Sequence, residues 1–373
     1  MQFHSSKASF SAIVSIGETI KKQSQEEGVE YLMLNRGVNS VVPIKLQKVV
    51  EAIDFNTPAI QVYPPARGRQ DLKEAINQSY FRKAFDSQNI LITGGGMPGL
   101  DLVFQTIDTK QILLPQFFWG SYYQILTIRR LTDKTDFYDS YEELEFKMPT
   151  QTAVVICDPN NPLGNKYDDE RLFNLIKQLN DHDNIVIFDS PYRRIFNDET
   201  DDFFQRIGDL ENVIIVESFS KSLGLSGQRI GFLYNKNKDL MDELAVRLMY
   251  STNGINGFAQ ELVWRLLATS EGHDAVRKFK ILTIDGIKKN ISFLESKQFL
   301  ATEFYTNSKP QGIFAIVNRS QEELLKHRIG SVALSYFTKR EIPNVNRYAR
   351  INISVPHGKL VRYFMALLDE KKD

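Results

Sequence analysis

Cysteine is almost absent from the chain, and its scarcity excludes an internal disulfide. Cys157 is the only cysteine among 373 residues, which suits a reducing compartment and predicts a cytoplasmic protein. It follows the apolar run at 153–156. We therefore expect a buried strand residue and a weak candidate for a nucleophile.

An excess of charge of either sign is also missing. Lysine plus arginine and aspartate plus glutamate both number 46, so neither nucleic acid nor an anionic membrane is an expected partner. The longest uncharged stretch, 111–128, contains Pro115, Gly120 and several polar residues, unlike a membrane span. Residues 1–7 lack the apolar segment of a secretory signal. The five histidines lie far apart, so we expect no metal site.

Short apolar runs alternate with helical patterns between about residues 70 and 250. The runs lie at 89–93, 111–114, 153–157, 185–188, 213–216 and 230–234. Continuous apolar runs are typical of strands buried on both faces, and their alternation with helices predicts an α/β fold with a mostly parallel, doubly wound sheet.

The length of the chain predicts two domains. We expect a large domain at 36–275 and a smaller α+β domain made of 1–35 together with 276–373. Within the smaller domain, apolar runs at 312–317, 332–335 and 350–354 are strand candidates, and a terminal helix should begin near His357. The 271–297 segment reads as one long helix or two.

Polar or turn-forming residues follow five successive apolar runs. They are the glycines at 94–96, the segment 115–119, the segment 158–164, Asp189 with Tyr192, and the segment 218–221. In open α/β sheets, ligands bind outside the carboxyl ends of the strands. The sequence therefore predicts one site built from these five strand ends.

Residues 218–231 indicate the chemistry most directly. A lysine in a crowded polar pocket is typical of Schiff-base chemistry, and Lys221 follows a strand-like run and stands between hydroxyl residues. Ser218, Ser220 and Arg229 are residue types that hold a phosphate. Pyridoxal phosphate needs both features, although a lone Ser-x-x-Lys is more often a solvated loop.

Together these motifs resemble the class I and II (fold-type I) pyridoxal-phosphate-dependent aminotransferases over nearly the whole chain. The most specific segments are Ser-Phe-Ser-Lys-(x)7-Arg-x-Gly at 218–231 and Asn-Asn-Pro-x-Gly at 160–164. The resemblance implies the fold-type I architecture, pyridoxal phosphate as cofactor, and transfer of an amino group between an amino acid and a 2-oxo acid.

The resemblance also implies roles around the cofactor ring. Lys221 matches the lysine that forms the Schiff base and then carries protons. Asp189 matches the carboxylate that pairs with the pyridinium nitrogen. Tyr192 and Asn161 match the groups that hydrogen-bond the phenolic oxygen, and Phe117 matches the aromatic residue that stacks on the ring.

Further matches concern the cofactor phosphate. The residues implied to hold it are Gly95, Gly96, Met97, Ser218, Ser220 and Arg229. Backbone N–H groups and a helix N-terminus would provide part of this phosphate site. Tyr63 matches a tyrosine that reaches the phosphate of the neighbouring subunit, which implies a homodimer with shared active sites.

The substrate side is implied by fewer residues. Arg350 matches the arginine that binds the substrate α-carboxylate with its planar fork, and Gly37 and Asn161 match residues near that carboxylate. No second arginine for an acidic side chain is recognisable in the sequence. We therefore expect neutral or aromatic amino acids to be favoured over aspartate.

Departures from the family pattern leave alternatives open. Asp158, Leu163, Ser190 and Gly99 replace residue types that are usual at their positions. A β-lyase, synthase or decarboxylase of the same fold would carry almost the same motifs. A non-catalytic regulator is a poor alternative, because only about 35 residues precede the core and they are not strongly basic.

Overall fold

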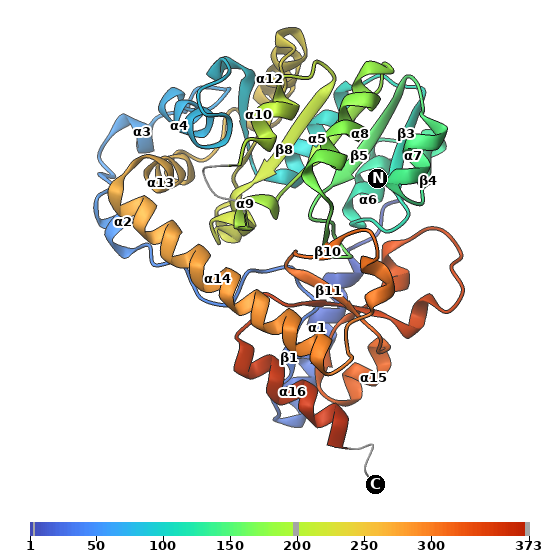
Figure 1. The fold of residues 1–373 in the computed structure, drawn as a ribbon. Helices are drawn as coiled ribbons and strands as arrows, with labels where there is room; N and C mark the ends of the chain where they lie inside the picture. Colours follow the sequence, from blue (N-terminus) through green and yellow to red (C-terminus); the bar gives the residue numbers. More distant parts are fainter. Residues whose placement is uncertain (3, 197–200, 370–373) are drawn as a thin grey trace.

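The centre of the fold is a seven-stranded sheet with the strand order β2-β9-β8-β7-β5-β3-β4 (Figure 1). The computed structural model describes residues 1–2, 4–196 and 201–369. The strands are β2 (Ile90–Thr93), β3 (Gln111–Pro115), β4 (Thr135–Tyr138), β5 (Thr152–Cys157), β7 (Ile185–Asp189), β8 (Val213–Ser218) and β9 (Gly231–Tyr234). β9 runs antiparallel to both of its neighbours, β2 and β8, and the remaining pairs are parallel.

The apolar runs became strands because both faces of the sheet are covered. Every residue of β5 and β8 is buried, as expected for parallel strands between two helical layers. The mostly parallel α/β sheet predicted from the sequence is thereby confirmed. The apolar runs did not predict β4, since this short edge strand alternates buried and exposed positions and carries a polar residue, Asp136.

Helices pack on both faces of the sheet. On one face, α5 (Gly96–Thr106) contacts β8 and β9 and is itself covered by α6 (Ser121–Ile128) and α12 (Lys238–Thr252). On the other face lie α8 (Asp169–Asp181) and α10 (Phe203–Gly208), flanked by α4 (Gln70–Phe81) and α7 (Tyr141–Lys147). The short helices are α2 (Gln47–Glu51), α3 (Pro58–Gln61), α9 (Arg193–Phe196) and α11 (Phe219–Ser222), and α13 (Gly257–Ala268) packs on α4.

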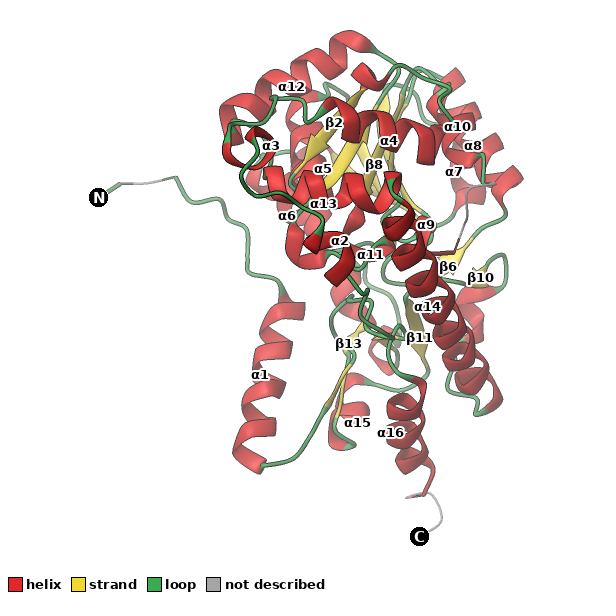
Figure 2. Ribbon diagram, turned by 90° about the vertical axis from the view of Figure 1, so that its left-hand side faces the viewer, coloured by secondary structure: helices red, strands yellow, loops and turns green. Residues whose placement is uncertain are grey.

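A second lobe lies below the carboxyl edge of the sheet in Figure 1. Its three-stranded antiparallel sheet has the order β11-β14-β13, with β11 (Phe314–Val317), β14 (Ala349–Asn352) and β13 (Val332–Ala333). Around it stand α1 (Ala12–Glu27), α15 (Gln321–Lys326) and α16 (His357–Asp369), as Figure 2 shows. The N-terminal segment joins this lobe because β1 (Leu32–Met33) pairs with β12 (Ile329–Gly330).

One long helix connects the two lobes. The 27-residue helix α14 (Ser270–Ser296) contacts α13 and α2 at one end and α16 at the other, a length of about 40 Å. The expected domain boundary near residue 275 falls inside this unbroken helix. The division into 36–275 and 1–35 with 276–373 stays a prediction. No helix within the described ranges is long and apolar enough to cross a membrane, and no group of metal-ligating side chains occurs there.

A glycine contact brings the lobes together beside the sheet edge. β6 (Asn165–Lys166) of the large lobe pairs with β10 (Lys309–Pro310) of the second lobe. Next to this pair, the backbone at Gly164 comes close to the backbone at Phe314. Gly164 has a φ of 69°, and a Cβ added there would lie 1.9 Å from the Phe314 carbonyl oxygen. Only glycine therefore allows the 158–164 loop to contact β11.

We expect Gly164→Ala to lower the free energy of unfolding by about 2–4 kcal/mol, because the new methyl group would force the two backbones apart. Urea unfolding of purified protein measures the change. Gly358→Ala is the matched control, since no heavy atom lies within 4 Å of a Cβ at that helical position. A Gly164→Ala protein as stable as this control would contradict the proposed backbone contact.

Candidate active site

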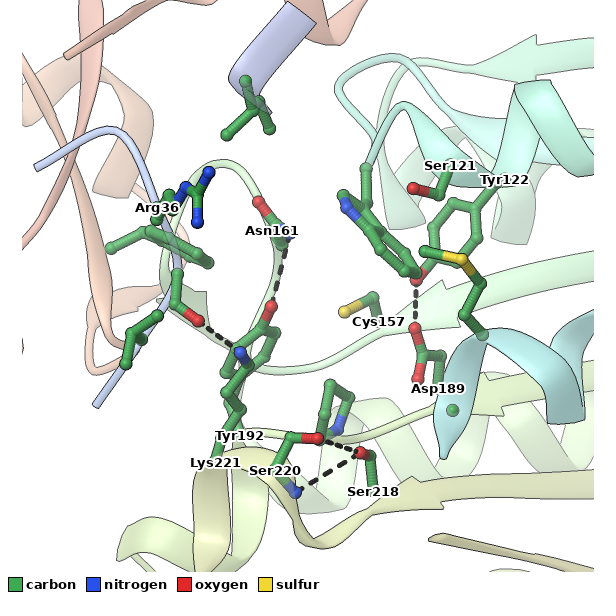
Figure 3. Close-up of a pocket in the computed structure, with 18 of the residues that line it drawn as sticks. Arg36, Ser121, Tyr122, Cys157, Asn161, Asp189, Tyr192, Ser218, Ser220 and Lys221 are labelled. Atoms are coloured by element: carbon green, nitrogen blue, oxygen red, sulfur yellow. Dashed lines mark hydrogen bonds between the residues drawn. The ribbon is translucent and has the colours of Figure 1, made fainter. Parts of the chain in front are cut away.

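A cavity of about 360 Å³ lies where the carboxyl ends of β5, β7 and β8 face the second lobe (Figure 3). The cavity brings together most of the site residues predicted from the sequence: Gly37, Gly96, Met97, Asn161, Asp189, Tyr192, Ser218, Ser220, Lys221, Arg229 and Arg350. The parallel strands end at the same edge of the sheet, and the turns that follow them carry the functional groups. Residues far apart in sequence therefore converge at this edge.

Asp189 ends β7 and is only 4 % exposed. The Tyr122 hydroxyl, from the first turn of α6, donates a hydrogen bond of 2.5 Å to Asp189 Oδ2 (Figure 3). Burial raises the pKa of Asp189 to about 7, and the Tyr122 hydrogen bond offsets part of the rise. A cationic group bound in the cavity would stabilise the ionised carboxylate.

Asn161 connects the large lobe to the second lobe. Its Nδ2 donates to the Tyr192 hydroxyl over 3.3 Å, and its Oδ1 accepts from Arg350 Nη1 over 3.0 Å. Burial raises the pKa of Tyr192 well above its usual value, so its hydroxyl stays protonated at neutral pH. One side chain thus positions a phenol on one side and a guanidinium on the other.

Lys221 lies on α11, directly after β8, and its Nζ donates to the Gly37 carbonyl oxygen of the second lobe (Figure 3). Burial, helped by the charges of Arg229 and Arg350, lowers the pKa of Lys221 to about 8. A larger share of neutral amine is therefore present near neutral pH than for a solvated lysine. Position 37 requires glycine, since a Cβ would lie 2.5 Å from the Phe314 ring.

Hydrogen-bond donors gather at the N-terminus of α5. Ser218 Oγ donates to Ser220 Oγ over 3.0 Å, and Arg229 Nη1 donates to the same Ser220 oxygen over 3.3 Å. Gly95 has a φ of 106°, and a Cβ added there would lie 2.9 Å from Arg229 Nη2. Hydroxyls, a guanidinium and a helix N-terminus around one space are suited to a phosphate group.

Arg350 is 1 % exposed on the central strand of the second lobe. Besides Asn161, its guanidinium donates to the Asn35 carbonyl oxygen and lies over the Phe314 ring at 4.2 Å. Its Nε has no hydrogen-bond partner among the described residues, and burial lowers the pKa of Arg350 to about 9. A buried cation without a carboxylate partner is costly, so this geometry favours binding of an anion.

Two of the departures from the family pattern have a structural explanation. The fully buried Asp158 carboxylate lies 3.3 Å from Lys166 Nζ and accepts a hydrogen bond from Tyr167 N, while Arg193 lies 3.9 Å away. The aspartate therefore serves a buried ion cluster that anchors the 158–164 loop. A Cβ on Gly99 would lie 3.1 Å from a Leu233 methyl group, which leaves little space for alanine.

The stacking role expected of Phe117 does not fit the structure. Phe117 lies outside the cavity, where it packs edge-on against Phe304 of the second lobe at 5.9 Å. The turn after β3 instead directs Trp119 into the cavity, where its ring meets Tyr122 edge-on. The sequence reasoning chose Phe117, whereas Trp119 is the residue among the three consecutive aromatics at 117–119 that lines the cavity.

Two other predicted residues lie outside the cavity lining. Gly95 stands just behind Gly96 and contacts Arg229, as described above. Tyr63 is 82 % exposed and does not reach the cavity of its own chain. Its expected action on a neighbouring subunit stays a prediction, because that role requires a second chain.

Several lining residues were missed by the sequence reasoning. They are Ser11, Ile13, Val14, Arg36, Trp119, Ser121, Tyr122, Pro191 and Phe314, together with Val38, Leu100 and Cys157. Tyr122 had a usable signal, since it follows Trp119 by three residues and so shares its helical face. The N-terminal residues had none, because no motif indicates that this segment folds back over the sheet edge.

Cys157 lies in the cavity wall, but its thiol is poorly suited to nucleophilic attack. Its Sγ donates to the Pro159 carbonyl oxygen over 3.4 Å. Burial raises the pKa of the thiol well above its usual value, and the charge of Asp189 raises it further. The thiol is therefore protonated at neutral pH and packs as a small apolar residue.

The side chains in the cavity fit pyridoxal phosphate, the cofactor that the motifs imply. Asp189 is a buried carboxylate without a cation partner in the part of the chain that the structure describes, which suits the pyridinium nitrogen. The Ser218, Ser220 and Arg229 cluster at the α5 N-terminus suits the phosphate, and Lys221 offers an amine. Each polar part of the cofactor thus has a complementary group.

Comparisons with known proteins agree with this fit. The family model described as aminotransferase class I and II matches residues 30–363. A probable aspartate aminotransferase of Methanocaldococcus jannaschii is 26 % identical over 275 residues, which cover 68 % of this chain and 69 % of that protein. A histidinol-phosphate aminotransferase of Sulfurimonas denitrificans is 23 % identical, with 78 % of this chain and 80 % of that protein covered.

Solved structures share the fold. The aspartate aminotransferase from Thermus thermophilus with maleate superposes with a TM-score of 0.81 at 18 % identity, covering 98 % of this chain and 100 % of that chain. At this identity the match shows the fold-type I architecture alone.

We expect Asp189→Asn to stabilise the ligand-free protein at alkaline pH. The carboxyl pKa is near 3.9 in an unfolded chain and about 7 in the folded one. Its ionisation therefore opposes folding increasingly as pH rises from 4 through 7. The asparagine does not ionise. At pH 8.5 the free energy of unfolding of the variant should therefore be about 2–4 kcal/mol higher than that of the wild type.

Urea unfolding of ligand-free protein at pH 4.5 and pH 8.5 measures this difference, most of which should vanish at the lower pH. Asp133→Asn, at an exposed position, is the matched control and should show no pH-dependent gain. An equal gain for Asp189→Asn at both pH values would trace the effect to packing and contradict the raised pKa.

Proposed function

The chain belongs to the class I and II aminotransferase family of pyridoxal-phosphate-dependent enzymes, and we propose that it moves the amino group of a neutral or aromatic L-amino acid to a 2-oxo acid, with Lys221 at the centre. One observation carries the proposal. A single cavity holds an amine of lowered pKa together with a buried carboxylate and a buried arginine, neither of which has an oppositely charged partner among the described residues.

Lys221 would hold the cofactor and then move the proton. Pyridoxal phosphate supplies an electron sink that stabilises negative charge on the substrate Cα. Once free, the Lys221 amine remains in the cavity with a lowered pKa. Its Nζ can therefore accept a proton from one atom and return it to another without a large free-energy penalty. The Gly37 carbonyl oxygen orients this amine.

Asp189 would keep the cofactor ring nitrogen protonated, and Tyr122 would hold the carboxylate in place. The Tyr122 hydrogen bond stabilises the ionised form of Asp189. Tyr192 and Asn161 would bind the phenolic oxygen of the ring, and their mutual hydrogen bond sets the distance between them. Trp119, in place of Phe117, is the aromatic residue in the cavity wall that can pack on the ring.

Arg350 would bind the α-carboxylate shared by donor and acceptor. Its guanidinium is buried and held by Asn161 and by the Asn35 carbonyl oxygen, which leaves Nε without a partner among the described residues. A bidentate contact to a carboxylate would satisfy it. Because every substrate carries this group, Arg350 contributes to binding and orientation and not to selection.

The preference for neutral or aromatic donors rests on the apolar part of the cavity wall. Ile13 and Val14 from α1, Trp119 and Phe314 line it, and such residues favour apolar side chains. Relatives named for aspartate and for histidinol phosphate show that the family includes other donors. The proposed donor class therefore rests on the residues that line the cavity of this chain and not on the names of its relatives.

A homodimer with shared sites is proposed from exposed aromatic residues. Tyr63 and Tyr250 are each 82 % exposed and Val62 is 59 % exposed. Gly254, which follows α12, is close to Pro64, since its added Cβ would lie 3.0 Å from the Pro64 ring. Clustered exposed apolar side chains indicate an interface. Tyr63 would reach the phosphate site of the partner subunit, and the proposed location is cytoplasmic.

The function is tested by locating the cofactor and by a donor screen. Borohydride reduction followed by peptide mass spectrometry should place the adduct on Lys221. Lys221→Ala should still bind the cofactor, but turnover should fall at least about 1,000-fold, because the amine that transfers the proton is missing. Lys45→Ala, at an exposed position, is the control and should keep full activity.

In the donor screen, neutral or aromatic amino acids should react faster than aspartate when a 2-oxo acid is present. An adduct on another lysine would contradict the role of Lys221. Release of pyruvate and ammonia without a 2-oxo acid acceptor would favour a β-lyase.

Shared active sites are tested by mixing inactive variants. Tyr63→Ala and Lys221→Ala, dissociated and reassembled together, should recover about a quarter of wild-type activity, since half the dimers are hybrids with one intact site. Asp189→Ala mixed with Lys221→Ala is the matched control and should recover nothing, because both residues act in the same chain. A fully active monomer in sedimentation would exclude the shared site.

A further inference from the structure

A second cavity, of about 220 Å³, lies between α1 and α15. Six residues of α1 line it, at positions 12, 15, 16, 19, 20 and 23, and this spacing of three or four places them on one face of the helix. Residues of α15, the link between β12 and β13, and the short turn at 334–337 complete the wall. No residue of this wall also lines the active-site cavity.

The cavity exists because α1 touches the second lobe along a narrow stripe. Only Gly17 and Ile20 are buried among the 16 residues of the helix. Gly17 lies so close to Asn35 that an added Cβ would be 2.7 Å from its Nδ2. Beside this stripe the helix carries three small side chains, which leave the space next to α15 unfilled: Ala12, Ser15 and Thr19.

Two buried polar atoms of the wall lack a hydrogen-bond partner among the described residues. They are Oγ of Ser331, a residue only 1 % exposed, and Oε1 of Gln23. On the facing helix, the Oε1 atom of Gln321 accepts from Ala333 N over 2.9 Å, and its amide nitrogen is a further donor. Buried polar atoms without partners cost free energy. Ser331 and Gln23 are therefore suited to a bound molecule that both accepts and donates hydrogen bonds.

The wall disfavours a charged ligand. Every side chain that lines the cavity is uncharged, so an ion would lose hydration there without gaining a counter-ion. Ile16, Ile20 and Leu325 supply apolar surface. The cavity is thus suited to an uncharged small molecule that combines an apolar ring with an amide-like group.

The helix α1 connects this cavity to the active site. Ile13 and Val14 line the active-site cavity, whereas their neighbours on the helix line the second one. The carbonyl oxygen of Ile13 accepts from Asn35 Nδ2 over 3.0 Å, and the carbonyl oxygen of Asn35 accepts from Arg350. A molecule that holds α1 against α15 therefore also holds part of the active-site wall.

We propose that the second cavity is an effector site for an uncharged, amide-like small molecule, and that its occupant strengthens substrate binding by fixing α1 in place. The occupant would accept a hydrogen bond from Ser331 and donate one to Gln23. Substrate and occupant both bind the arrangement in which α1 lies against the second lobe, so by linkage each favours the binding of the other.

Calorimetric titration of the holoenzyme with benzamide tests the site. Benzamide has a ring, an amide donor and an amide acceptor, and we expect a Kd of about 0.1–1 mM for a ligand of this size. Benzamidine has the same shape but is a cation, and it should bind at least about tenfold more weakly. Wild-type protein that binds benzamide no more tightly than benzamidine would overturn the inference. This measurement needs no turnover and is independent of the proposed donor class.

Variants locate the bound benzamide. Ser331→Ala should weaken its binding about 5- to 20-fold, while the Tm of the ligand-free protein stays the same or rises because no hydrogen bond is lost. Ser15→Phe, at an exposed position of the wall, should block the cavity and abolish binding. Ser335→Ala, a nearby serine outside the wall, is the matched control. Wild-type affinity in both Ser331→Ala and Ser15→Phe would overturn the site.

Coupling to the active site is measured with the fastest donor of the screen. Saturating benzamide should lower its KM about two- to fivefold in the wild type and in Ser335→Ala, and should change kcat less than about twofold. Ser15→Phe should show no response. An unchanged KM in the wild type would overturn the effector role. A KM that benzamide raises in every variant would place it in the active-site cavity as a competitor and overturn the inference.

Discussion

Burial of ionisable side chains without counter-ions is the constraint on which the rest of the structure depends. Asp189, Lys221 and Arg350 each have a pKa displaced by burial toward the neutral form. Such groups oppose folding. The apolar seven-stranded sheet and its two helical layers supply the stabilisation that offsets them, and in the proposed function the cofactor and substrate would supply the missing charges.

Both lobes contact these groups and hold them in place. The large lobe positions side chains at strand ends, whereas the second lobe acts largely through main-chain carbonyls at 35–37 and through β14. Asn161 joins the two systems, and the ion cluster around Asp158 fixes the loop that carries it. A close approach of backbones at Gly164 lets that loop touch β11. The site is therefore a property of the lobe interface.

The strand ends could be predicted from the sequence, because parallel strands all present their carboxyl ends at one edge. The sheet followed from the apolar runs, whereas the family and the cofactor followed from the motifs at 160–164 and 218–231, which resemble those of the family. Phe117 was chosen over Trp119, which lines the cavity, because local sequence does not say which of three neighbouring aromatic residues turns inward. Arg36 had no motif to indicate that it lines the cavity, whereas Tyr122, which contacts Asp189 within the large lobe, had a usable signal in its spacing from Trp119. The edge strand β4 lacked an apolar run, and its polar residue reflects its half-exposed position.

The segment at 35–37 has an evolutionary consequence. Its three carbonyl oxygens contact Asn352, Arg350 and Lys221, and any residue type provides such an oxygen. The side chain at position 36 is thus uncoupled from the reaction chemistry, although it stands beside it. A substitution there leaves the groups that would perform the chemistry in place, so the cavity wall at position 36 can change in small mutational steps.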